Sequence, residues 1–152
     1  MRRRCGRYWT VAMRACPDVN VLIHAANPGS AHGDDAREYL RRSLTSGLLL
    51  LPDVASSFCR IVTNRRIFAD PSSMEQARSV IDALLGRAGV SLAAPSAKRL
   101  ALMFRLCQAH AITGDEVADA YLVAGAMDVG AVFITYDQRL ARLGPDLVRV
   151  LP

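Results

Sequence analysis

The feature that most constrains the fold is the segment 113–137, where a helix signal, a strand signal and several acidic residues follow one another. Thr113 followed three residues later by Glu116 is the pattern of a capping box, which predicts that a helix begins at Thr113. Gly130 is a residue type that often follows the end of a helix, and the apolar run 131–135 after it is typical of a short buried strand. The segment therefore predicts a helix and then a strand of an α/β domain.

Three aspartates lie at positions in this unit from which they can reach one pocket. Asp115 and Asp119 are four residues apart, so on a helix they share a face, and Asp137 follows the predicted strand. In open α/β sheets, ligands bind beyond the carboxyl ends of the strands, and the helices between strands begin at that same edge. We therefore expect Asp115, Asp119 and Asp137 to line one pocket.

Asp18 can join this pocket only if a strand precedes it. Propensity alone favours a strand over 19–23, which would place Asp18 at the opposite edge of the sheet. The apolar positions of 19–26 fit a helical spacing equally well. We therefore predict a strand within 11–17, then Asp18, then a helix.

The rest of the chain alternates between strand and helix patterns. Four apolar residues fall on one face of the last predicted helix before residue 113 and are expected in the core: Leu100, Met103, Phe104 and Cys107. Helices are expected over 31–46, from 52 to 62, over 72–87 and over 95–110, and strands over 48–51, 90–93 and 147–151. This alternation predicts a three-layer α/β/α sandwich with a central parallel sheet.

Composition favours one compact domain, because 51% of the 152 residues are hydrophobic and 22% are charged. The net charge of +5 is local: residues 1–16 hold five arginines and no acid, which leaves 14 basic residues against 14 acidic ones. We interpret 1–12 as a basic N-terminal extension, disordered or from a misassigned start, with an RNA-attracting arm as the alternative, and 13–152 as the folded domain. Without a membrane span or a signal peptide, we expect a cytoplasmic protein.

Clustered carboxylates need a cation, because neighbouring like charges raise each other's pKa. Magnesium prefers oxygen ligands, and a divalent ion held by carboxylates can activate water for attack on a phosphodiester. The three histidines have no metal or triad spacing, and the four cysteines form no C-x-x-C pair. The acids therefore indicate metal-dependent phosphoryl chemistry.

Four separate motifs resemble those of PIN-domain ribonucleases and, more narrowly, of VapC-type toxins of bacterial type II toxin–antitoxin modules. The motifs are residues 18–22, 58–68, 113–120 and 135–137, and the resemblance covers roughly residues 14–151. It implies a PIN-like fold and a toxin that is a Mg²⁺-dependent endoribonuclease, with Mn²⁺ as the alternative ion. It also implies a homodimer that acts on RNA and is inhibited by a cognate VapB-type antitoxin. No membrane partner is expected, because the longest purely aliphatic run, 48–51, is far too short to span a bilayer.

The resemblance also implies roles for individual residues. Its metal-site acids correspond to Asp18, Asp119 and Asp137. Asn20 and Thr135 correspond to polar residues that orient the carboxylates or the metal-bound water.

The chain departs from the family pattern at Ser57, where a glutamate usually stands. Asp115, one turn before Asp119, is the predicted catalytic replacement, and Asp53 is a weaker candidate. The departure also leaves open a different function, that of a catalytically weakened PIN-like module that binds RNA or a partner protein.

A basic loop, which includes Arg65 and Arg66, corresponds to a recurring loop of the family whose arginines contact RNA. A helix C-terminus with basic residues is an adequate structural explanation of the same pair.

Overall fold

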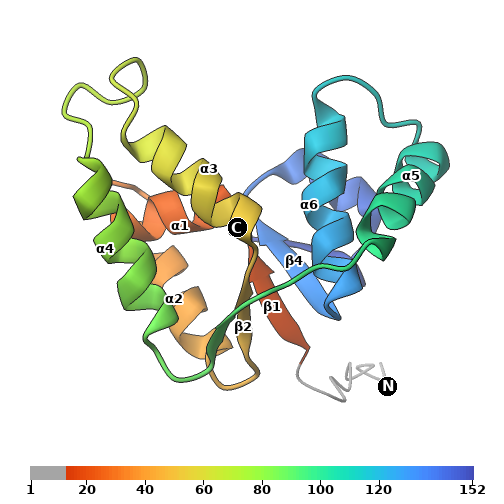
Figure 1. Ribbon diagram of the computed structural model, residues 1–152, viewed down its shortest axis with the longest axis horizontal. Helices are drawn as coiled ribbons and strands as arrows, with labels where there is room; N and C mark the ends of the chain where they lie inside the picture. The colour runs from red at the N-terminus through yellow and green to blue at the C-terminus, as the bar shows by residue number, and fades with distance from the viewer. Residues whose placement is uncertain (1–12) are drawn as a thin grey trace, which may run out of the picture.

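The computed structural model of the protein describes residues 13–152, so the predicted extension over 1–12 lies outside the described residues. Five parallel strands form one sheet in the order β3-β2-β1-β4-β5 (Figure 1). The strands are β1 (Arg14–Pro17), β2 (Leu48–Leu50), β3 (Val90–Leu92), β4 (Ala131–Thr135) and β5 (Val148–Val150). The predicted parallel sheet is therefore confirmed.

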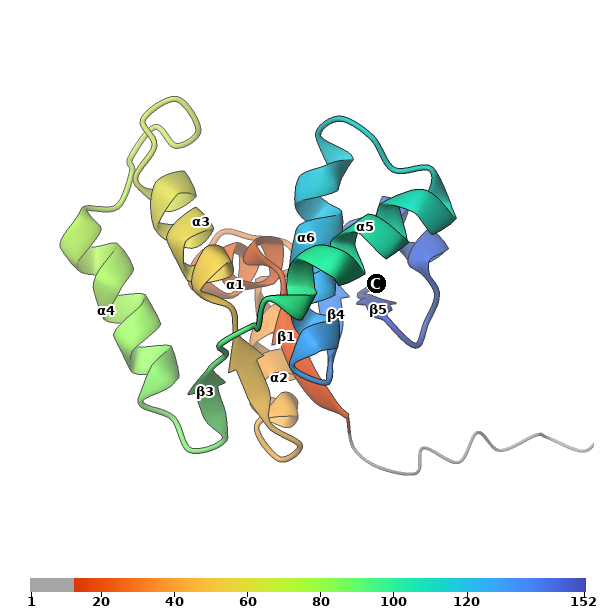
Figure 2. The same ribbon diagram turned by 45° about the vertical axis from the view of Figure 1, so that its right-hand side comes forward.

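Helices cover both faces of the sheet. They are α1 (Val19–Ala26), α2 (Gly33–Ser43), α3 (Pro52–Val62), α4 (Met74–Leu85), α5 (Lys98–His110), α6 (Glu116–Asp128) and the 3₁₀ helix η1 (Gln138–Leu143). In Figures 1 and 2, α5 and α6 lie together on the right, and α1, α3 and α4 lie together on the left. The arrangement confirms the three-layer α/β/α sandwich. Among the helices of residues 13–152, none has the length and apolar character needed to cross a bilayer.

The two faces of the sheet are distinguished by alternating residues along the central strands. In β4, Ala131 and Phe133 join the larger core cluster, which includes the buried residues of α6, whereas Val132 and Ile134 join a smaller cluster with Ala36 of α2. This period of two is what a strand buried on both faces requires. The continuous apolar run of the sequence is therefore explained by burial on both sides.

The strand order reverses between β1 and β4. From β1 the chain proceeds outward to β2 and β3, and it returns to the other side of β1 to form β4 and then β5. Such a switch point creates a crevice at the carboxyl ends of the two strands. Asp18 follows β1 and caps α1, which confirms the strand predicted within 11–17.

The start of α6 differs from the prediction. The helix begins at Glu116 with Asp115 as its N-cap residue, and no side-chain capping bond is present. Gly114 has a φ of +61°, a left-handed conformation that cannot belong to a right-handed helix. The predicted capping box of Thr113 and Glu116 is therefore wrong, because the backbone leaves the helical conformation between them.

One face of α5 is also less buried than predicted. Met103 is buried and Cys107 is half-buried, but Leu100 and Phe104 are 52% and 54% exposed. The prediction that all four lie in the core is wrong for Leu100 and Phe104. Helical spacing identifies an apolar face, but it does not distinguish packing within the chain from an outward-facing surface.

Candidate active site at the carboxyl edge of the sheet

Asp18 is fixed by hydrogen bonds to both of its carboxylate oxygens. Oδ1 accepts the backbone N–H of Val19 at 2.6 Å. Oδ2 accepts the hydroxyl of Thr135 at 2.6 Å and the amide of Asn20 at 2.9 Å. Since the residue is only 8% exposed, the carboxylate is buried with its orientation set by β4 and α1.

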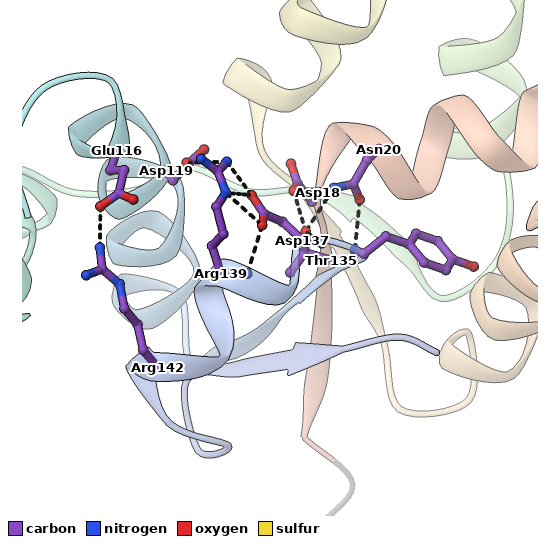
Figure 3. A network of polar contacts seen from close by, with 9 residues as sticks. Asp18, Asn20, Glu116, Asp119, Thr135, Asp137, Arg139 and Arg142 are labelled. Carbon is purple, nitrogen blue, oxygen red and sulfur yellow. Dashed lines mark hydrogen bonds and ion pairs between the residues drawn. The ribbon is translucent and has the colours of Figure 1, made fainter.

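Asn20 and Thr135 extend this network across the two central strands (Figure 3). The Asn20 amide also donates to the Thr135 hydroxyl oxygen at 2.9 Å, and its own oxygen accepts the backbone N–H of Tyr136 at 3.2 Å. The Thr135 hydroxyl oxygen accepts the backbone N–H of Asp137 at 3.0 Å. The two residues therefore join the end of β1 to the end of β4.

Asp137 and Asp119 approach from the other side and meet at Arg139. Asp137 is the N-cap of η1, and its Oδ1 accepts the backbone N–H of Arg139 at 2.9 Å. The Arg139 Nη2 lies 2.6 Å from Asp137 Oδ2 and 3.8 Å from Asp119 Oδ2. Figure 3 shows the guanidinium between these two acids, with Asp18 beyond Asp137.

Burial and neighbouring charges shift the pKa values of the three aspartates in different directions. Burial raises the pKa of Asp18, the hydrogen bonds from Thr135 and Val19 lower it, and the nearby charges of Asp119 and Asp137 raise it. The pKa of Asp119 is also raised, chiefly by burial, although Arg139 opposes the shift. The hydrogen bond from Arg139 lowers the pKa of Asp137. The negative form is therefore disfavoured at Asp18 and Asp119 and favoured at Asp137, which accepts hydrogen bonds from Arg139.

Two acidic residues at the start of α6 have different surroundings. The Glu116 carboxylate pairs with Arg142 of η1, and it adds to the negative charge near Asp119. Asp115 is exposed, and its side chain makes no hydrogen bond or ion pair with another residue in the described part of the chain. Glu116 is therefore committed to a partner, and Asp115 is not.

The other predicted site residues lie on or after α3. Ser57 is half-buried within the helix. Asp53, in the first turn, pairs with Arg99 at 2.7 Å. Arg65 and Arg66 are exposed in the loop that follows the helix. Figures 1 and 2 show the loop after α3 and the loop before α6 extending to the same side of the molecule.

The sequence did not lead us to predict that Arg139 and Arg99 pair with acidic residues near the site. Arg139 is two residues after Asp137, and an arginine at that distance from a strand-terminal acid is a usable signal once the acid is assigned. Arg99 pairs with a residue 46 positions away, and no local pattern indicates such a contact.

The donor set of the site consists of carboxylate, hydroxyl and amide oxygens, which suits a hard divalent cation. Across residues 13–152, no three acidic, histidine or cysteine side chains are already gathered closely enough to surround an ion. The chemistry of the donors therefore fits such a cation, and its ligands would have to draw together to bind it.

Comparisons with known proteins give one consistent family. The PIN domain family model matches residues 15–144. Ribonuclease VapC43 of Mycobacterium tuberculosis is 34% identical over 129 residues, which are 84% of this chain and 88% of that protein. Ribonuclease VapC25 of the same species is 30% identical over 127 residues, which are 82% and 89% of the two chains.

Two solved structures have a similar fold at 17% sequence identity. The structure of VapBC2 from Rickettsia felis, bound to a DNA fragment from its promoter, matches with a TM-score of 0.66 over 90% of this chain and 97% of that one. The structure of VapC20 from Mycobacterium tuberculosis, described as a sarcin–ricin loop cleaving toxin, matches with a TM-score of 0.64 over 91% and 99%.

Proposed function

The chain belongs to the PIN-domain family and, within it, to the VapC ribonucleases, and we propose that Asp18, Asp119 and Asp137 form its catalytic centre. It is a ribonuclease of the toxin–antitoxin type, and the proposed reaction is metal-dependent hydrolysis of a phosphodiester bond within an RNA chain. The observation that supports this assignment best is that the three acids, from the end of β1, the first turn of α6 and the end of β4, lie near enough at one edge of the sheet for the charges of Asp119 and Asp137 to raise the pKa of Asp18 (Figure 3). We also propose that the protein acts in the cytoplasm, where RNA is available.

The three acids would hold a divalent cation, with Mg²⁺ as the proposed ion and Mn²⁺ as the alternative. When bound, the cation would neutralise the carboxylates, polarise the phosphodiester and activate a water molecule for attack. Thr135 and Asn20 hold the Asp18 carboxylate in one orientation through the hydrogen bonds described above. Their proposed role is to keep Asp18 ready for the cation, because fixed outer-shell partners typically strengthen metal binding.

We propose that Asp115 supplies the acid that is absent at Ser57. Asp53 is engaged with Arg99 and Glu116 with Arg142, whereas the Asp115 side chain has no partner within residues 13–152. Asp115 also has a helical backbone conformation one turn before Asp119, so its carboxylate can approach the same site.

The catalytic assignment is tested with Asp18→Asn and Asp119→Asn, which remove a charge and preserve side-chain shape. Cleavage of RNA in Mg²⁺ or Mn²⁺ should fall by more than about 100-fold in each, since loss of an outer-shell partner alone costs about 10–100-fold. Growth inhibition should disappear with it, while circular dichroism shows an intact fold. If either variant remains fully active, the assignment is wrong.

The role of Asp115 is tested by comparing Asp115→Asn, Asp53→Asn and Glu116→Gln in the same cleavage assay. Asp115→Asn should lose about 10–100-fold in activity, the range for an outer-shell partner. The other two should stay close to wild type, because their carboxylates are paired with arginines. A large loss in Asp53→Asn that keeps a wild-type fold by circular dichroism, with no loss in Asp115→Asn, would move the fourth acid to α3.

The serine at position 57 favours a second candidate function, a module that binds RNA or a partner protein without cleaving. The two functions give different results in one experiment. The proposed enzyme cleaves RNA in the presence of divalent metal and stops when a chelator is added. The alternative retains RNA or partner binding and shows no cleavage under either condition.

The proposed partner is a VapB-type antitoxin that places a basic side chain in the acid site and an apolar segment beside α1. Two neighbouring cavities, of about 300 and 200 Å³, flank α1, and Val80 of α4 lines both. Val80→Asp should weaken binding of the antitoxin at least about 10-fold, because it places an unpaired charge in an apolar contact. Leu92→Asp is the matched control, since Leu92 is exposed and lines neither cavity.

We also propose that the protein is a homodimer through α5. Leu100 and Phe104 are large, exposed and one turn apart on this helix, an arrangement that favours a protein interface. The double variant Leu100→Asp/Phe104→Asp should sediment as a monomer. Met74→Asp on α4, which also replaces an exposed apolar residue, should leave the dimer intact.

Arg65 and Arg66 are proposed to contact the RNA backbone from the loop after α3. Replacing both with alanine should weaken RNA binding and reduce its dependence on salt, because fewer counterions are released from the phosphates. Unchanged RNA affinity and salt dependence would leave these arginines with a structural role at the end of α3.

A further inference from the structure

Arg139 occupies the position of a cation between two of the proposed metal ligands. Its Nε lies 3.0 Å from Oδ1 and 3.1 Å from Oδ2 of Asp137, and its Nη2 lies 2.6 Å from Oδ2. The same Nη2 is 3.8 Å from Asp119. The guanidinium therefore engages both oxygens of Asp137 and also neutralises part of the charge of Asp119.

The contacts of Arg139 can be broken at low cost. Its side chain is 66% exposed, and ion pairs at such positions are weakened by water and salt. The freed guanidinium can be hydrated in place without movement of the fold. An ion pair of this kind exchanges readily with a stronger cation.

A divalent cation and the guanidinium require the same carboxylate oxygens. Both oxygens of Asp137 accept hydrogen bonds from Arg139, so an ion that takes them must displace these bonds. Two positive groups in one place would also repel each other. Occupancy of the site by the two groups is therefore mutually exclusive.

We propose that Arg139 is a positioning residue that serves as a displaceable counter-ion of the acid site. In the metal-free protein it holds Asp137 and Asp119 near each other, and binding of the divalent cation releases it. This inference rests on the proposed function, since it takes these aspartates to be metal ligands. It adds a way in which that site is regulated: the affinity for the metal depends on competition between the cation and the Arg139 guanidinium for the same carboxylates.

The neighbouring pair of Arg142 and Glu116 provides a matched control. Arg142 is on the same 3₁₀ helix and also pairs with a carboxylate of α6, but it contacts neither Asp119 nor Asp137. A substitution there removes the same kind of charge from the same surface. Only a change at Arg139 should alter competition for the metal ligands.

The experiment measures Mn²⁺ binding at neutral pH by titration calorimetry in wild type, Arg139→Gln, Arg139→Lys and Arg142→Gln. Arg139→Gln should bind Mn²⁺ about 2- to 5-fold more tightly, the range expected from loss of one exposed ion pair. Arg139→Lys should fall between, because an ammonium keeps the charge but lacks the planar fork. Arg142→Gln should match wild type.

A second measurement tests the same competition without reference to catalysis. If Arg139 binds the acids only in the metal-free state, the free energy of unfolding of Arg139→Gln should be lower than that of wild type without metal. At saturating Mn²⁺ the two proteins should have the same free energy of unfolding. By linkage, the stability lost in the metal-free protein should correspond to the gain in metal affinity. Urea denaturation with and without Mn²⁺ provides both values.

The outcomes separate this inference from the proposed function. Equal Mn²⁺ affinity in wild type and Arg139→Gln, or weaker binding in Arg139→Gln, overturns the role of Arg139 while leaving the metal site intact. Absence of Mn²⁺ binding in all four proteins overturns the metal site itself, and the inference with it. Tighter binding in Arg139→Gln alone, with the matching loss of metal-free stability, establishes the competition.

Discussion

Two arginine–aspartate pairs flank the carboxyl edge of the sheet, and they differ mainly in burial. Arg99 of α5 reaches Asp53 of α3 at 2.7 Å with a side chain that is 7% exposed. Arg139 of η1 reaches Asp137 at 2.6 Å with a side chain that is largely exposed. The two pairs therefore have similar nitrogen–oxygen distances, but one lies in the core and the other at the surface.

The surroundings of Arg99 show what burial adds. Its Nε donates to the carbonyl of Tyr121 at 2.9 Å, and its guanidinium lies 3.6 Å above the Tyr121 ring. The pair thereby joins α3, α5 and α6, and separating it would leave a charge in an apolar setting. Arg139 is exposed to solvent, so another cation can replace it beside Asp137. Arg99 is buried, so its pair with Asp53 stays formed in the folded protein.

The largest expected effect comes from breaking the buried pair. Arg99→Met should lower the free energy of unfolding by about 2–4 kcal/mol, through loss of the ion pair, the hydrogen bond and the contact with Tyr121. The value lies below the upper range for buried pairs because Asp53 is half-buried and can be rehydrated. Urea denaturation measures it, and a loss no larger than that of Arg139→Gln would remove the distinction between the pairs.

A methyl group beside Arg99 should have the next largest effect. A Cβ built on Gly125 would lie 2.9 Å from Arg99 Nε and 3.0 Å from Cζ, closer than ordinary contacts allow. Gly125→Ala should therefore cost about 1–3 kcal/mol by displacing the guanidinium from its partners. If thermal unfolding shows Gly125→Ala to be as stable as wild type, Arg99 is less tightly held than the structure indicates.

A smaller effect is expected from pH, with opposite signs for two acids of one site. The pKa of Asp18 is raised by burial, so its contribution to metal-free stability is present below its unfolded pKa and is lost as pH rises through the folded value. The pKa of Asp137 is lowered by Arg139, so its contribution is present above the unfolded pKa and is lost as pH falls through the folded value.

These signs are read from the pH dependence of urea unfolding, rather than from stability at one pH. Relative to wild type, Asp18→Asn should become more stable as pH rises from mild acid to neutral, because asparagine does not titrate. Relative to wild type, Arg139→Gln should become less stable as pH rises through the ordinary pKa range of an aspartate, and this difference should then stay constant up to neutral pH. Parallel curves for the three proteins would contradict both assignments.

The sequence predicted the elements well because their signals are local. Apolar spacing and turn residues located the strands β2 to β5 and the helices α2 to α6 within a few residues, whereas the 3₁₀ helix η1 was not predicted. Local signals alone did not predict the structure around Asp18. Propensity favoured a strand after this residue, and only the expectation that it shares a pocket with the other acids required a helix there. An argument from function corrected one from local preference, because a short apolar run fits both periods.

The two arginine pairs could not be predicted in the same way. Arg99 finds Asp53 through the packing of α5 beside the sheet, a contact that depends on the whole fold. Arg139 is close to Asp137 in sequence, but its approach to Asp119 follows from the docking of η1 near α6. The exposed face of α5 was missed for a related reason, since Leu100 has the spacing of a core residue without the burial.

The smallest expected effect, and the sharpest test of the comparison, is the response of the two pairs to salt. Arg139→Gln should cost at most about 1 kcal/mol at low salt, as exposed ion pairs do, and about 1 M NaCl should remove most of that cost because it shortens the screening length to about 3 Å. The cost of Arg99→Met should persist, since ions do not enter the contact between the guanidinium, Asp53 and Tyr121. The measurement is urea unfolding of metal-free wild type and both variants at low and high NaCl, with Arg142→Gln as the control for an exposed pair. If salt reduces the two costs by the same fraction, burial does not distinguish the pairs. If the cost of Arg139→Gln resists salt, the guanidinium is held too firmly to yield to a divalent cation at the acid site.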